Sequence, residues 1–418
     1  MAVDLDRKIR LATADRYANP RNPSALLPIS YGNWLDPAAM PADDEDGGIT
    51  PCVNIDRLNW VYCVNDAPAG SAAPKVYVND TVQSAQVYAY NPAIDYEGTG
   101  VVIAALQFLV DPGEAEISVR FQGTVDGSGA LITNPVAAIK DFFTRRGGWS
   151  LADFDPTSCT QSQFDLLQLD EQMRWCFAVD ETPRQWLRRI CLHYHMDFGL
   201  ADDRLALRLD RSMTAFPPPI AAELDATLDC LSLDSQGDGV RYWANQDDLI
   251  TQVRVRWRGK WTNGDTIEET DVAYPVGKNL YGELRQSFDL PGLYTETHGS
   301  RWVAALFLRQ GILSPMVEFH TRYLHAAGVG TGQFIAFTWA RRNWQRRLLK
   351  VLNVETDLER QTQRFTCLDC RRNAPDPVTL PIGALPPRRR RRRTRIFPWQ
   401  GISGALLQKF LAYRYRVN

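Results

Sequence analysis

The side chains of this 418-residue chain that could do chemistry are mainly its cysteines, histidines and clustered acids. Cys191, His193 and His195 are donors of the kind that bind zinc, at alternate positions along the chain. They fall at the end of an expected helix, where residues two apart point in different directions, so we interpret them as structural. Cys367 and Cys370 form a lone CxxC pair, whereas a zinc site needs four ligands. The sequence therefore predicts no metal site and no cofactor.

Other patterns give no support to an enzyme. The acidic run at residues 43–46 lacks the alternate ligands and central glycine of a calcium loop, and is typical of a solvated loop. The glycine-rich stretch 328–332 lacks the lysine of a phosphate-binding loop. The five histidines have no nucleophile motif beside them, and most of the twelve tryptophans lie in strand or helix patterns that favour core packing over sugar binding. We predict that the chain is not an enzyme.

The strongest charge pattern is a basic C-terminal segment. From residue 378 onward there are ten Lys or Arg and no Asp or Glu, which leaves the other 377 residues with 37 basic and 49 acidic groups, a net charge of −12. Adjacent arginines repel one another, so we expect an exposed arm that binds an acidic partner. A short helix capped by Ser403 would follow, with one apolar stripe. The candidate partner-binding residues are Arg388, Arg389, Arg390, Arg391, Arg392, Arg393, Arg395, Leu406, Leu407, Phe410 and Leu411.

The sequence leaves several partners open for this segment. The stripe could pack into a groove on another chain, fold back on its own body, or lie on an anionic membrane. Nucleic-acid binding is less favoured as the main function, because no recognition motif accompanies the arginines. The acidic body suits a wall past which DNA slides, since duplex DNA carries one negative charge per about 1.7 Å, and it equally suits ordinary surface solubility.

Two kinds of local pattern predict the secondary structure of the first half of the chain. Short β-type runs separated by turn residues fill residues 26–123, and predict antiparallel β-structure. Asn134-Pro135 and Thr182-Pro183 each place an N-cap residue before a proline at the first helical position, and predict two helices. Residues 198–207 are expected to form two strands around a polar turn.

After residue 229 the β-type pattern returns. Apolar residues alternate with arginines over residues 253–258, which predicts a strand with one buried and one cationic face. Asn263-Gly264 predicts a hairpin with a return strand at 266–270. A helix is expected over 295–310, and further strands reach residue 368. No run approaches the roughly 18 apolar residues of a membrane span, and the start lacks the apolar run of a signal peptide.

Four segments taken in order resemble a known family. They are Leu27-Pro-Ile-Ser-Tyr-Gly32 with Pro51-Cys-Val-Asn-Ile-Asp56, the helix at 134–143, the helix at 182–190, and the stretch 245–339. Together they are similar to the hub proteins at the tip of tailed-bacteriophage tails, a family also represented in contractile injection machines. Each motif is short, so their shared order across residues 25–370 carries the resemblance.

The resemblance implies an α+β fold, mainly antiparallel β, with two β-barrel hub domains flanking an α/β segment and a basic C-terminal extension. The expected divisions are an N-terminal arm (1–24), a first hub domain (25–130), the α/β segment (131–229), a second hub barrel (230–375), and a Pro/Arg-rich linker with an amphipathic helix (376–418).

The same resemblance implies a structural virion protein, assembled in the host cytoplasm, that ends the tail tube. The expected partners are two further copies in a homotrimeric ring, the tail tube or distal tail protein, the tape-measure protein, and tip fibre or spike proteins. DNA would be a partner only in transit, and a membrane only for the C-terminal helix. A cell-wall-degrading or sugar-binding tail component is the alternative.

Overall fold

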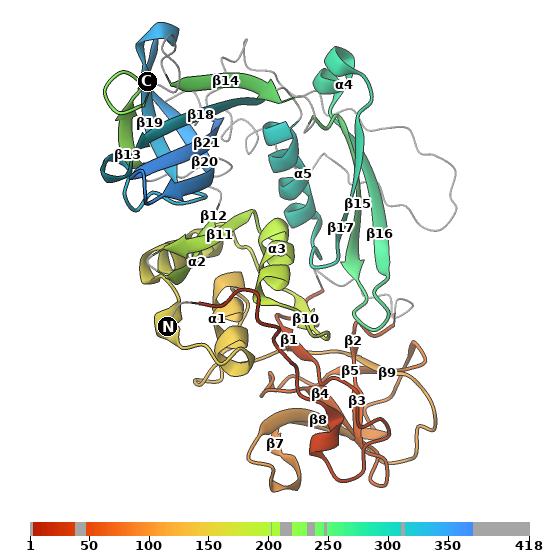
Figure 1. Ribbon diagram of the computed structural model, residues 1–418. Helices are drawn as coiled ribbons and strands as arrows, with labels where there is room; N and C mark the ends of the chain where they lie inside the picture. Colours follow the sequence, from red (N-terminus) through yellow and green to blue (C-terminus); the bar gives the residue numbers. More distant parts are fainter. Residues whose placement is uncertain are drawn as a thin grey trace.

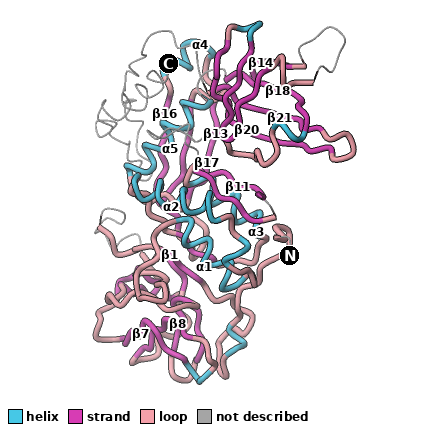
Figure 2. The backbone as a smooth tube through the Cα atoms, turned by 90° about the vertical axis from the view of Figure 1, so that its left-hand side faces the viewer, coloured by secondary structure: helices cyan, strands magenta, loops and turns pink. Residues whose placement is uncertain are grey.

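The computed structural model describes residues 3–37, 47–201, 203–209, 220–231, 239–245, 249–310 and 314–370. Within them the chain is mostly antiparallel β-structure with five α-helices, which confirms the predicted α+β class. Figures 1 and 2 show an elongated arrangement, with an N-terminal β region at one end and a six-stranded sheet at the other. The segment that carries the predicted partner-binding residues, 388–418, lies outside the described residues.

The N-terminal β region, residues 47–125, contains two four-stranded sheets. One has the order β2-β9-β5-β6 and the other β3-β4-β8-β7. A single stretch of chain enters both, because it leaves the first sheet at Cys52, between β2 and β3. The strands are β2 (Thr50–Pro51), β3 (Val53–Asp56), β4 (Val61–Asn65), β5 (Lys75–Val78), β6 (Thr81–Val82), β7 (Tyr88–Asp95), β8 (Val102–Phe108) and β9 (Ile117–Arg120).

Alternation along β4 explains how this region is buried on both sides. Tyr62 and Val64 point into the core between the two sheets, whereas Val61 and Cys63 point to the opposite face. That outer face is covered by the N-terminal segment, whose Ala14 and Tyr17 pack on it. The described residues of the segment predicted as an N-terminal arm, 3–24, thus pack against the body and include a 3₁₀-helix at Ala14–Arg16.

The middle region, residues 131–209 together with β1, holds three helices. Their N-caps follow one rule, because Asn134, Asp155 and Thr182 each precede a proline and accept backbone N–H bonds from the first turn. The first and third helices were predicted, whereas the second was not. The elements are β1 (Ile29–Tyr31), α1 (Pro135–Arg146), α2 (Pro156–Gln168), β10 (Trp175–Phe177), α3 (Pro183–His193), β11 (Met196–Ala201) and β12 (Arg204–Leu209).

The structure explains the glycine that ends the motif Leu27-Pro-Ile-Ser-Tyr-Gly32. The strand β1 pairs with β10, and Gly32 follows it with φ of +92°. A Cβ atom at this position would lie 1.9 Å from the carbonyl oxygen of Met173. Only glycine fits this close approach of two backbones.

A third unit, residues 249–310, is named the brace because it runs along the long axis of the molecule in Figure 1. Its central strand β15 pairs antiparallel with β16 and parallel with β17. The hairpin between β15 and β16 confirms the prediction from Asn263-Gly264. The elements are β15 (Gln252–Gly259), β16 (Thr266–Ala273), α4 (Pro275–Tyr281), β17 (Arg285–Leu290) and α5 (Glu296–Gln310).

The six-stranded sheet, here called the C-terminal sheet, has the order β13-β19-β20-β21-β18-β14. All its pairs are antiparallel except β13 with β19. In the part of the chain that is described, each sheet keeps two edge strands, so backbone hydrogen bonds close no barrel and the two predicted barrels stay a prediction. The strands are β13 (Ile220–Asp225), β14 (Val240–Asn245), β18 (Ser314–Arg322), β19 (Phe334–Trp339), β20 (Trp344–Asp357) and β21 (Thr362–Asp369).

Candidate assembly site

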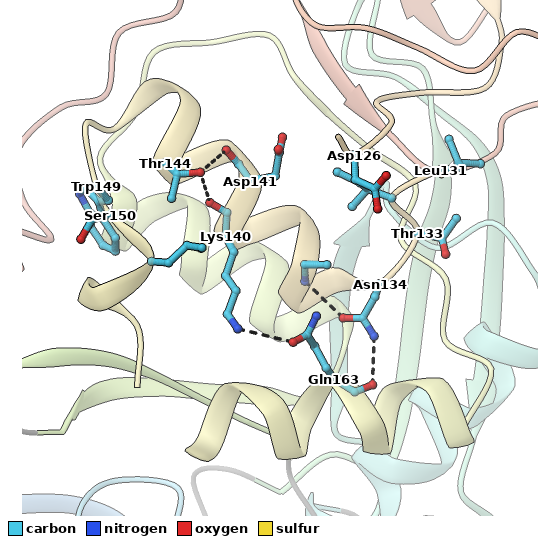
Figure 3. A pocket seen from close by; sticks show the side chains of 13 residues that line it. Asp126, Leu131, Thr133, Asn134, Lys140, Asp141, Thr144, Trp149, Ser150 and Gln163 are labelled. Atoms are coloured by element: carbon cyan, nitrogen blue, oxygen red, sulfur yellow. Dashed lines mark hydrogen bonds between the residues drawn. The ribbon is translucent and has the colours of Figure 1, made fainter. Parts of the chain in front are cut away.

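A groove of about 700 Å³ lies along the outward side of α1 (Figure 3). It exists because α1 buries one face and presents the opposite one, at Asn134, Ala137, Lys140, Asp141 and Thr144, to an open space. The loop before α1, the loop after it and α2 supply the remaining walls. Those walls are Asp126, Leu131, Ile132, Thr133, Trp149, Ser150, Leu151 and Gln163.

Gln163 of α2 ties one wall of the groove to α1. The Asn134 side chain accepts N–H bonds from Val136 and Ala137, and its Nδ2 donates to the carbonyl oxygen of Gln163 at 3.1 Å. The Nζ of Lys140 lies 3.5 Å from the Gln163 Oε1 (Figure 3). The capping residue that starts α1 therefore also fixes its distance from α2.

The two carboxylates of the groove are held by neighbours. Asp141 forms an ion pair with Arg145 at 2.9 Å and accepts the Tyr31 hydroxyl at 2.6 Å. Asp126 accepts hydrogen bonds from Ser128 and Ala130, and these bonds, with that of the Ser128 side chain largest, lower the pKa of Asp126. Asp126 therefore stays ionised at neutral pH and is unsuited to donate a proton.

Large apolar side chains on α2 and on the loop before it are exposed. Leu151, which lines the groove, is 71% exposed, and Leu167 is 70% exposed. Leu167 lies one helical turn beyond Gln163, on the same side of α2. Phe164 beside it is 54% exposed. Of these three residues Leu151 lines the groove, and Leu167 lies next to its α2 wall. Exposed apolar residues at a groove are typical of an interaction site.

The predicted Cys191, His193 and His195 group does not converge on one point. The Cys191 thiol is buried, which raises its pKa. The Nδ1–H of His193 donates to the Arg189 carbonyl oxygen at 2.7 Å, and burial lowers the pKa of His193 to about 3. The His195 ring stacks near Trp302 instead.

The cysteines of the lone CxxC pair end β21. Cys367 is fully buried in the core of the C-terminal sheet, and Cys370 follows the strand. Over the described residues, no group of three or more His, Cys, Asp or Glu side chains is placed to hold a metal ion.

The cationic face of β15 is neutralised by its neighbours. Arg254 pairs with Asp271 of β16 at 3.0 Å, and Arg256 pairs with Asp289 of β17 at 2.5 Å. The predicted alternation of faces is confirmed from Val253 to Trp257, with Val253 and Val255 buried on the other side. It is wrong at Arg258, which is buried and lies 3.4 Å from Glu268, because the pairing register of β15 with β16 skips this residue. Since Arg254 and Arg256 are paired with carboxylates, this face carries little uncompensated positive charge.

The contacts that hold the regions together were missed by the sequence analysis. Trp261, at the β15–β16 turn, donates its backbone N–H to the Ile49 carbonyl oxygen at 2.8 Å and its Nε1–H to the Tyr294 hydroxyl at 3.0 Å. Buried Glu171 lies 3.1 Å from the Nε2 of His298 and also pairs with Arg301, both on α5. An aromatic residue two positions before an Asn-Gly turn was the available signal for the first contact.

Comparison with known proteins relates the fold to virion proteins. No known family's sequence profile matches the chain, and no curated protein sequence does. A chain from the virion of a native gene transfer agent particle is 12% identical, with a TM-score of 0.52 over 88% of this chain and 89% of that chain. That similarity shows a shared fold across nearly the full length of both proteins.

Two further similar structures are tail proteins. The 43 kDa tail protein of prophage MuSo2 from Shewanella oneidensis is 9% identical, with a TM-score of 0.36 over 74% of this chain and 88% of that chain. A tail protein from Neisseria meningitidis is 9% identical, with a TM-score of 0.34 over 74% of this chain and 86% of that chain.

Among the helices that the structure describes, none has the length and apolar character to cross a membrane.

Proposed function

We propose that this chain is a structural protein of a phage-type tail, the hub at the tail tip or baseplate that ends the tail tube and recruits further tip proteins for DNA delivery. The observation that carries the proposal is the similarity to the gene transfer agent chain over 88% of this chain and 89% of that one. Because a fold by itself does not fix a function, the role needs a direct test.

Curvature of the C-terminal sheet supports its use as a ring segment. Tyr242 on β14 contacts Trp344 and Trp339, with ring centroids 5.4 Å and 6.4 Å apart. The strands β14 and β19 are four positions apart in the sheet, about 19 Å if the sheet were flat. The sheet must therefore curl until its two ends share one core, as a barrel does.

The N-terminal β region supports the same role by a different construction. Its two sheets pack face to face around one apolar core, and the strand that leaves one sheet at Cys52 enters the other. Strands that switch sheets at a corner are the usual way in which small β-structures wrap around their core. Two such units in one chain would give a trimeric ring six wall segments around the tail passage.

The proposed partners follow from the proposed role as a ring at the end of the tail tube. They are two further copies of the chain, the tail tube or distal tail protein, the tape-measure protein, and tip fibres or spikes, with assembly in the host cytoplasm and DNA in transit through the ring. In this proposal residues 25–130 and 230–375 are the two hub domains, 131–229 is the connecting segment, and the basic segment recruits a later tip component.

A truncation tests the recruiting role. Deletion of residues 388–418 removes the candidate partner-binding residues and none of the described body. We expect the truncated chain to fold and to enter particles that lack a later tip component, as seen by electron microscopy and by protein composition of purified particles. A matched variant in which the six arginines at 388–393 are replaced by glutamine separates charge from length. Complete, infectious particles from the truncated chain would disprove the recruiting role.

A further inference from the structure

The apolar rim of the groove along α1 needs an explanation that the ring proposal does not give. Leu151 and Leu167 expose about 70% of their surfaces, although burial of such apolar side chains is favourable. Asn134 to Thr144 spans ten residues of α1, which corresponds to a groove about 15 Å long. That length accommodates about three turns of a second helix.

The same chain carries a segment with matching properties. Residues 403–411 would form a helix about 14 Å long with one apolar stripe at Leu406, Leu407, Phe410 and Leu411. Such a helix gains its stability from packing, so it needs a groove.

Charge and reach favour this segment as the occupant. Residues 371–418 contain twelve Lys or Arg and one Asp, whereas residues 1–370 contain 35 basic and 48 acidic residues. Two carboxylates, Asp126 and Asp141, line the groove against one cation, Lys140, and Asp153 follows the exposed Leu151. The 32 residues between Cys370 and Ser403 span up to about 105 Å when extended, more than enough to reach the groove.

We propose that residues 403–411 dock in the groove between α1 and α2 of their own chain, with the apolar stripe against Ala137, Leu151 and Leu167. A tether of this length keeps the segment at an effective concentration near the millimolar range, which favours the same chain over a second copy. The free subunit then keeps its recruiting segment covered. This inference concerns the isolated chain and stands whether or not the chain is a tail hub.

Photo-crosslinking in the purified full-length chain tests the docking. With the photoreactive residue p-benzoylphenylalanine in place of Phe410, we expect a crosslink of monomer mass whose other end maps to residues 126–168. A dimer-mass product that grows with protein concentration would replace this proposal by docking on a second copy. Crosslinks to other parts of the chain, or none, would overturn it.

Substitutions in the groove and in the stripe test whether residues 403–411 dock specifically in this groove. Leu167→Glu places a charge where the stripe should pack and is expected to reduce the crosslink yield at least fivefold, as is the paired change Leu407→Asp with Leu411→Asp. Leu358→Glu is the matched control, because Leu358 is equally exposed at the far β20–β21 turn. Each variant is first shown to have the wild-type melting temperature. An unchanged yield with Leu167→Glu would contradict docking in this groove.

Discussion

The two ends of the molecule are attached by different kinds of contact. The N-terminal β region meets the brace through aromatic side chains, and Tyr294 of the brace belongs to the apolar core of that region. The C-terminal sheet meets the middle region through polar contacts, with Lys350 2.6 Å from Asp197 and Arg208 donating to the Thr331 carbonyl oxygen at 2.9 Å. Within the described residues, the core of the C-terminal sheet includes no residue from another region.

This difference indicates which parts must move together. A shared apolar core resists separation in proportion to the area it buries, so the N-terminal β region, the middle region and the brace should behave as one body. A joint made of ion pairs and single hydrogen bonds is weaker and depends on pH and salt. The C-terminal sheet is therefore the part whose position can adjust when subunits assemble.

The largest effect is expected for Tyr294→Ala in the aromatic joint. Tyr294 is 1% exposed, its ring packs edge-on against Trp34 at 5.1 Å, and its hydroxyl donates to the Gly259 carbonyl oxygen at 2.5 Å. Loss of a buried aromatic ring costs about 3–5 kcal/mol of unfolding free energy, measured by urea denaturation. The control Leu280→Ala, on exposed helix α4, should change it by less than about 0.5 kcal/mol. A small effect of Tyr294→Ala would refute the shared core.

An intermediate effect is expected from pH, acting on the joint between brace and middle region. His193 belongs to α3 of the middle region, and its backbone carbonyl oxygen lies 3.0 Å from the Nε2 of His298 on α5 of the brace. The His193 ring packs edge-on against Trp175 at 4.9 Å, and its Nε2 has no hydrogen-bond partner among the described residues. Burial holds its pKa at about 3, below the 6.5 of an exposed histidine. The unfolded chain therefore takes up a proton as the pH falls below 6.5 while the folded chain does not, and stability is lost over that range.

The size of this pH effect can be isolated by substitution. Between pH 7 and pH 5, His193 should contribute a loss of about 2 kcal/mol. His193→Phe removes the titrating group but keeps a ring, so its unfolding free energy should fall by about 2 kcal/mol less than that of the wild-type chain over the same interval. Leu192→Gln, an exposed neighbour on α3, retains His193 and should keep the wild-type slope. Equal slopes in all three chains would show that His193 is not neutral when folded.

Local patterns predicted most elements but not their assembly. The strands at 53–56 and 253–258 alternate apolar and polar residues, and the helices after Asn134 and Thr182 have caps that act within one turn. The helix α2 was missed although Asp155-Pro156 uses the same cap, because its apolar face is short and interrupted by polar residues.

The pairing of strands that lie far apart along the chain could not be predicted from the sequence. The parallel pair of β13 with β19 joins residues more than a hundred positions apart, and period-two alternation carries no information about partners. The groove was missed for a related reason. The outward face of α1 has the polar composition of any solvated helix face, and only the position of Gln163 and the two neighbouring loops turns it into a groove. The predicted residues at 388–418 fall outside the described part of the chain, so they stay a prediction.

The smallest effect is expected at the polar joint, from Asp197→Asn. Lys350 is 1% exposed but Asp197 is 29% exposed, so solvent screens the pair and loss of the negative charge should cost only about 1–2 kcal/mol. Lys350→Met removes the buried charge and fills the same space, so it should leave unfolding free energy within about 1 kcal/mol of wild type. Urea denaturation at low and high salt measures both. If Asp197→Asn costs as much as Tyr294→Ala, the two joints are equally strong, and the C-terminal sheet is as firmly fixed as the other end of the molecule.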